Sequence, residues 1–196
     1  MYQDETLYTG PIEEPEIECE GLSEDEIEAR GKQYLDGDGV EQDLDEALRW
    51  FAKSKSALAR ICSAVAYEKK NDVINAEKEY LRGIELGNHA ETAYACELLG
   101  KLYVMKEKPD YEKAISYLEK GIQMEPGFGN TFTGYLGMAY EGCGQKVQAI
   151  HWYREAVENY GLEEYRTNLY KLYLTGAAGA AKKKMAEEYL QEERKM

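Results

Sequence analysis

The sequence is poor in the residue types on which catalytic and metal sites depend. Its 196 residues include only two histidines, four prolines and four cysteines. Because His89 and His151 are the only histidines, the sequence has almost no residues from which to build a histidine-based acid–base or metal site. No run of about 18 apolar residues occurs, so a membrane-spanning helix is excluded. These shortages predict a protein that is not an enzyme and has no membrane partner.

The cysteines are too far apart to form a recognisable site. Cys19, Cys62, Cys96 and Cys143 are separated by 43, 34 and 47 residues, with no CxxC pair and no nearby histidine cluster. The first residues also lack the basic start and apolar stretch of a secretory signal. We therefore expect a cytoplasmic protein with reduced thiols, most of them small core residues, and neither metal nor cofactor.

The charge is strongly and unevenly acidic. The chain has 24 Lys and Arg against 38 Asp and Glu, a net charge of −14, which argues against nucleic acid and anionic membranes as partners. Residues 1–20 contain seven acidic residues, no basic residue and two prolines. This composition predicts a flexible acidic leader before a single domain at 21–196. The leader is either a solvated tail or a segment that folds into the protein's own groove or binds a basic partner.

A tyrosine recurs along the chain in similar four-residue motifs, such as GKQY and GKLY, at spacings of 33, 36, 37 and 33 residues. Each tyrosine is followed by an alanine that opens an amphipathic stretch, as in ALRWF, AISYL and AIHWY. Such a period is the mark of a repeat protein. The five tyrosines are Tyr34, Tyr67, Tyr103, Tyr140 and Tyr173, and the five alanines are Ala47, Ala76, Ala114, Ala149 and Ala186.

A small residue stands three places before four of these tyrosines: Gly31, Ala64, Gly100 and Gly137. On a helix, that spacing puts the two on one face and lets a second helix approach closely. Each unit is therefore predicted to be a helical hairpin that buries its apolar face only by stacking on its neighbours. Tyr170 takes the place of the small residue in the fifth unit, which is degenerate.

Capping and turn residues place the helices of these hairpins. Ser23 with Glu26 forms a capping box, Asp43 can cap the second helix, and Pro126 ends another at or before Glu125. No alternating strand pattern of useful length competes. The expected helices span 23–35, 43–54, 56–70, 73–86, 90–106, 110–124, 129–142, 146–160, 162–175 and 180–194.

The first unit resembles a known family. The segment GKQYLDGDGVEQDLDEALRWF, from Gly31 to Phe51, is similar to a Sel-one-like repeat, a variant of the tetratricopeptide repeat (TPR). The spacing from small residue to alanine is 16 in the first and last units, typical of Sel-one-like repeats, and 12 in the second and fourth, as in ordinary TPR hairpins. The resemblance covers about 22–196. It implies an all-α solenoid, a right-handed superhelix of about five helix-turn-helix repeats.

The resemblance also implies a concave groove that holds protein or peptide partners. Carrying the family's groove-facing positions onto the first helix of each pair gives an apolar floor with lysines that could reach a peptide carboxylate or acidic side chains. The candidate peptide-binding residues are Lys32, Ile61, Val65, Lys69, Tyr94, Glu97, Lys101, Met105, Met138 and Lys171. Glu28 and Lys32 stand where chaperone-tail binders of the wider family carry a carboxylate clamp, which disfavours that ligand.

The predicted function is therefore a non-catalytic protein–protein interaction module, an adaptor or assembly scaffold. Two alternatives stay open: a dedicated chaperone for a secreted or assembly-prone client, and a self-assembling repeat protein. In the second, Met185, Tyr189, Leu190 and Met196 would form a dimer face, unless the charges of the last helix make it a polar cap. We expect a monomer or weak homodimer.

Overall fold

The structure is a computed structural model that describes residues 21–193, with only the backbone described at 128–131, 181 and 188–193. These residues form ten α-helices and no strand, which confirms the predicted all-α fold. The predicted leader, residues 1–20, lies outside the described residues. The α-helices are α1 (Glu24–Asp36), α2 (Leu44–Lys53), α3 (Ala57–Lys69), α4 (Val73–Leu86), α5 (His89–Met105), α6 (Tyr111–Met124), α7 (Gly129–Gly142), α8 (Lys146–Arg154), α9 (Arg166–Leu174) and α10 (Ala180–Glu193).

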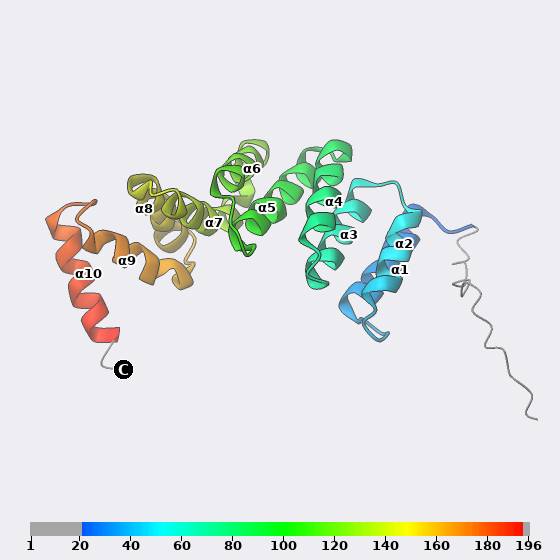
Figure 1. The fold of residues 1–196 in the computed structure, drawn as a ribbon, viewed down its shortest axis with the longest axis horizontal. Coiled ribbons are helices and arrows are strands. Elements are labelled where there is room, and N and C mark those ends of the chain that lie inside the picture. Colours follow the sequence, from blue (N-terminus) through cyan, green and yellow to red (C-terminus); the bar gives the residue numbers. More distant parts are fainter. Residues whose placement is uncertain (1–20, 194–196) are drawn as a thin grey trace, which may run out of the picture.

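The helices stand in one file, from α1 and α2 at one end to α9 and α10 at the other (Figure 1). Each odd-numbered helix pairs with the next to form a hairpin, and each hairpin packs on the following one. In the described part of the chain, no helix is both long enough and apolar enough to cross a bilayer.

The expected caps begin and end the helices. Ser23 and Glu26 form the capping box of α1, and the side chain of Asp43 accepts from the first amides of α2. Gly37 ends α1 in the left-handed conformation, at φ 74°, which favours glycine because it has no Cβ. The polar caps predicted from the sequence therefore located the starts of α1 and α2 to within a residue.

The two helices of a hairpin meet at the predicted small residue. A Cβ added to Gly31 would lie 2.5 Å from the ring of Phe51, and one added to Gly137 would lie 2.4 Å from the ring of Tyr153. At Gly100 the same place is filled by Leu118. Each of these partners stands four residues after its alanine and is fully buried. The glycine thus leaves space that a large buried side chain of the second helix fills.

Tyrosine hydroxyls link successive hairpins. Tyr103 on α5 donates to Glu77 on α4, at 2.7 Å, and Tyr140 on α7 donates to Glu119 on α6. Burial, followed by the hydrogen bond to Glu119, raises the pKa of Tyr140 to about 12, so the hydroxyl stays a donor. Two of the five repeating tyrosines therefore tie the third and the fourth hairpin to a carboxylate of the hairpin before.

Two of the described cysteines are buried in the core: Cys96 is fully buried and Cys62 nearly so. Burial raises the pKa of each thiol to about 11, which keeps both protonated at neutral pH. Cys143 is partly exposed, and all three thiols are free. Cys62 and Cys96 are thus small core residues, as predicted.

The C-terminal part departs from the expected helix bounds. The predicted helix at 146–160 is α8 followed by a π-helical turn, Glu155–Asn159, in which the Tyr160 amide donates to the Glu155 carbonyl. The predicted helix at 162–175 begins with a 3₁₀ turn, Glu163–Tyr165, before α9. Gly161, at φ 69°, separates the two turns. The wider π turn and the glycine reverse the chain direction between them.

Gly137→Ala tests the close contact inside a hairpin. The added methyl would meet three buried ring atoms of Tyr153, and overpacking of this kind costs about 1–3 kcal/mol. We expect a net loss of about 1–2 kcal/mol in the free energy of unfolding, measured in urea, although alanine is the better helix former. Gly127→Ala, with nothing within 4 Å, is the control and should change little. An unchanged or higher stability of Gly137→Ala would contradict this packing.

Candidate functional site

The first helices of the hairpins form one continuous side of the array, since α1 contacts α3, α3 contacts α5 and α5 contacts α7. Tyr165, just before α9, extends this side, because its ring lies against Gly134 on α7, 2.1 Å from where a Cβ would be. The same ring stacks on Tyr153 at 5.9 Å. The fifth repeat is therefore joined to the fourth through an aromatic ring that fills the space above a glycine.

Three tyrosines and three glutamates lie together on this side. We call the surface formed by Glu68, Tyr94, Glu97, Tyr135, Glu164 and Tyr165 the first-helix face. Tyr94 is 46% exposed, and Tyr135 and Tyr165 are half-buried. The face therefore presents aromatic rings that are neither in the core nor free in solvent.

Electrostatics shows that the residues of the first-helix face are neighbours. Burial, followed by the charges of Glu97, Glu68 and Glu164, raises the pKa of Tyr135. Burial, Tyr135 and Glu164 raise the pKa of Tyr165 to about 12. The charged side chains that act on these two phenols are carboxylates, so the middle of the face is negative.

The candidate residues occupy very different environments. Tyr94 and Met105 are exposed, and Lys171 is also exposed on α9. Ile61 is 1% exposed and packs against Gly83, so it has no surface to offer a ligand and belongs to the core. Val65 and Met138 are partly buried. Val65 packs against the core residues of α1–α3 and those of α3–α7, and Met138 against those of α3–α7 and those of α8–α10.

The polar candidates are likewise unequal. Lys69 donates to the Leu35 carbonyl at 2.9 Å and pairs with Asp36, so it ties α3 to α1. Lys32, Glu97 and Lys101 are partly exposed. Of the ten candidates, the structure places Tyr94 and Glu97 within the first-helix face.

Sequence reasoning did not select Tyr135, Tyr165 or Glu68. Tyr94 stands six residues before Gly100 on α5, and Tyr135 stands two residues before Gly137 on α7. The two offsets differ by four residues, about one helical turn, so the tyrosines lie on equivalent faces of their helices. That offset was the available signal for Tyr135. Tyr165 had none, because the 3₁₀ turn that carries it replaces the start of the expected helix.

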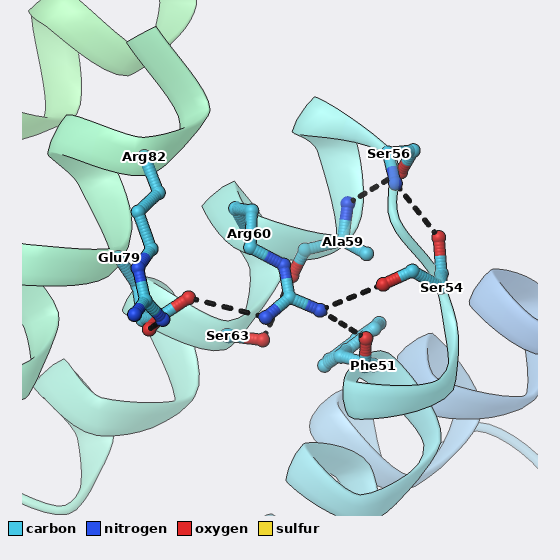
Figure 2. A network of polar contacts seen from close by, with 8 residues as sticks. All are labelled: Phe51, Ser54, Ser56, Ala59, Arg60, Ser63, Glu79 and Arg82. Atoms are coloured by element: carbon cyan, nitrogen blue, oxygen red, sulfur yellow. Dashed lines mark hydrogen bonds and ion pairs between the residues drawn. The ribbon is translucent and has the colours of Figure 1, made fainter. Parts of the chain in front are cut away.

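A buried polar network joins the first two hairpins (Figure 2). The guanidinium of Arg60 on α3 donates to the Phe51 carbonyl at 2.5 Å and the Ser54 carbonyl at 2.8 Å, and it pairs with Glu79 on α4. Glu79 is 7% exposed and also accepts from Arg82. Arg60 thereby satisfies backbone carbonyls at the end of α2. The two terminal nitrogens of Arg60 and the carboxylate of Glu79 are used within the fold, which marks the network as a structural junction. The buried Nε of Arg60 makes no hydrogen bond to a described residue.

A second group of polar residues lies at the same junction. Glu28 on α1 is 7% exposed and accepts from the hydroxyls of Ser54 and Ser56, between α2 and α3. Ser56 in turn caps α3 through the Ala59 amide. No group of three or more His, Cys, Asp or Glu side chains that could hold a metal ion occurs within the described residues.

Successive antiparallel helix pairs with a shared core define a helical repeat solenoid, a class that generally serves protein–protein interaction. The Sel1 repeat family matches residues 31–57, 93–125 and 135–160. The chain therefore contains three Sel1 repeats within a TPR-like array of helices. The second and last units have no match.

The fold is similar to that of two solved MamA structures. One, of MamA protein, is 26% identical with a TM-score of 0.58, over 74% of this chain and 76% of that chain. The other, of MamA, is 26% identical with a TM-score of 0.59, over 71% and 80%. A Sel1 repeat protein from Oxalobacter formigenes is 21% identical, with a TM-score of 0.46, over 86% and 84%. No curated protein matches the chain by sequence.

Arg60→Met tests the junction between the first two hairpins. The substitution keeps much of the side-chain volume but removes charged hydrogen bonds to two carbonyls and a buried partner of Glu79. We expect the free energy of unfolding to fall by about 2–4 kcal/mol. Because repeats are coupled through their interfaces, the loss should appear first in the hairpin that holds Trp50.

The measurement is the fluorescence of Trp50 during urea unfolding, in a Trp152→Phe background. Arg49→Met is the matched control, since Arg49 pairs with Glu46 at a partly exposed site and such pairs contribute at most about 1 kcal/mol. Equal effects of the two substitutions would show that the buried network does not couple the hairpins.

Proposed function

We propose that this protein is a non-catalytic interaction module that binds a segment of another protein along the first-helix face, as an adaptor or assembly scaffold in the cytoplasm. The single observation behind this proposal is the line of tyrosines and glutamates that crosses α3, α5, α7 and the turn before α9. A solenoid core requires its large aromatic side chains to be buried, as Tyr80 and Tyr153 are. Tyr94 is 46% exposed, so the core does not explain why a large aromatic side chain stands at this position.

The chemistry of the face favours a partner segment that carries lysine or arginine beside apolar side chains. Half-exposed tyrosine rings offer apolar area and a negative π face to a cation. Glu97 and Glu164 add carboxylates that pair with the same cations. Exposed Met105, on the same helix as Tyr94, adds an adaptable apolar surface at 62% exposure. An acidic segment would be repelled, which also makes the protein's own residues 1–20 a poor occupant.

The self-assembly alternative has less support in the described residues. Of its expected dimer face, the side chains of Tyr189 and Leu190 and the whole of Met196 lie outside what the structure describes. Met185 is partly buried against the core cluster of α8 and α9. The oligomeric state stays a prediction.

A photo-crosslinking amino acid placed at Tyr135 tests the proposed face. In the native cell, we expect this variant to crosslink a discrete partner, and we expect a further Tyr94→Ser substitution to reduce the yield several-fold by removing a neighbouring ring. The control carries the crosslinker at Ile74 on α4, which is 81% exposed but lies on a second helix. The crosslinked partner peptide, identified by mass spectrometry, should be rich in lysine or arginine.

Equal crosslinking from Ile74, or a yield that Tyr94→Ser does not change, would count against the first-helix face. A partner peptide rich in acidic residues would contradict the proposed partner chemistry.

A further inference from the structure

A cavity of about 340 Å³ is lined by residues of α8, α9 and the start of α10. Figure 1 shows these three helices at the C-terminal end of the array. The size of the cavity is at the lower end of the range for small-molecule sites. The lining combines apolar Val147 and Ile150 with the cationic side chains of Arg154 and Lys182. No carboxylate is among its described lining residues, whereas the cavities beside Lys78 and Arg82 and beside Lys106 and Lys108 each hold two carboxylates as well.

The cavity is also lined by Tyr173, whose hydroxyl lacks a partner. Tyr173 is fully buried, and its oxygen makes no hydrogen bond to any residue that the structure describes. A buried hydroxyl without a partner costs free energy, so such groups are rare in folded proteins. Burial, followed by the charge of Glu158, raises the pKa of Tyr173, while Arg154 lowers it. Arg154 therefore lies close to the hydroxyl, which stays protonated and able to donate.

The earlier repeats show which group is missing. Tyr103 and Tyr140, the equivalents of Tyr173, donate to Glu77 and Glu119 on the preceding second helix. Glu77 stands one residue after its repeat alanine and Glu119 five residues after, so both lie on the same helical face.

For Tyr173, the preceding second helix is α8. The residues one and five positions after its repeat alanine, Ala149, are Ile150 and Arg154. Both line the cavity. The last repeat therefore has an apolar residue and a cation at the two positions where the third and fourth repeats each supply a carboxylate to the tyrosine.

We propose that this cavity binds a small organic carboxylate. One carboxylate oxygen would accept from the Tyr173 hydroxyl, replacing the glutamate of the earlier repeats. The cations would balance the charge: the Lys182 ammonium lies 5.6 Å from the centre of the Tyr173 ring, and Arg154 uses only its Nε and Nη2 for Glu158 among the described residues. Val147 and Ile150 would contact the aliphatic part. This site is independent of the first-helix face.

Two-dimensional ¹H–¹⁵N NMR of the full chain tests the site, with butyrate as the probe and butyramide, its uncharged analogue, as the control ligand. We expect saturable shifts of amides in α8 and α9 and in the turn before α10 with butyrate, and none with butyramide. Tyr173→Phe and Arg154→Gln should each weaken butyrate binding about 10-fold or more, because each removes a hydrogen bond or charge at the carboxylate. Tyr103→Phe, at the equivalent position two repeats earlier, should bind as the wild type does.

Thermal unfolding without ligand provides a second readout. Tyr173→Phe should not lower the melting temperature, because its hydroxyl has no acceptor, whereas Tyr103→Phe should lower it by removing the bond to Glu77. A matching loss in Tyr173→Phe would show that the hydroxyl already has an acceptor in the protein, such as Glu158, and would overturn the proposal. So would butyramide binding as well as butyrate, or an absence of saturable shifts.

Discussion

The close contact of two helices at a glycine is the constraint on which the rest of the structure depends. At Gly31, Gly100 and Gly137, the absence of a side chain lets the partner helix bury Phe51, Leu118 or Tyr153 against bare backbone. This contact fixes how the two helices of a hairpin sit together, and so which residues face the next hairpin. The continuous first-helix face follows from repeating the same contact along the chain. Where the glycine is lost, as at Tyr170, the last hairpin instead stacks Tyr170 on Tyr173.

Within this frame, the hairpins alternate between two ways of filling the same space. In the second and fourth, Tyr80 and Tyr153 donate to Glu68 and Glu141, each of which directly follows the repeating tyrosine. In the first and third, the same two positions hold Phe51 with Leu35 and Leu118 with Val104, all buried. A ring hydroxyl occurs only where a carboxylate accompanies it, as expected if buried polar groups must be satisfied together. Tyr173 differs, because its buried hydroxyl has no acceptor among the described residues. The cavity beside it is therefore where the fold departs from this pattern of paired polar groups.

Most of the fold could be predicted from the sequence because its signals are local. The tyrosine period, the small residues and caps such as Asp43 place the helix bounds to within a residue or two, except where α8 ends and α9 begins. The candidate site could be predicted less well. Ile61 and Tyr94 occupy first helices alike, yet one is buried by Gly83 and the other is exposed. That difference depends on which groups of the neighbouring helix pack over each position, which the repeat period does not specify. Tyr165 was missed because it lies in a turn whose position depends on the π-helical end of the preceding helix.

The most direct test of the central claim is hydrogen–deuterium exchange of the protein, with and without the partner that crosslinking identifies. This measurement reports on every helix at once. If the first-helix face is the binding surface, the partner should slow exchange in α3, α5 and α7 and leave α2, α4 and α6 as they are. Protection confined to the second helices, or to the C-terminal end alone, would contradict it.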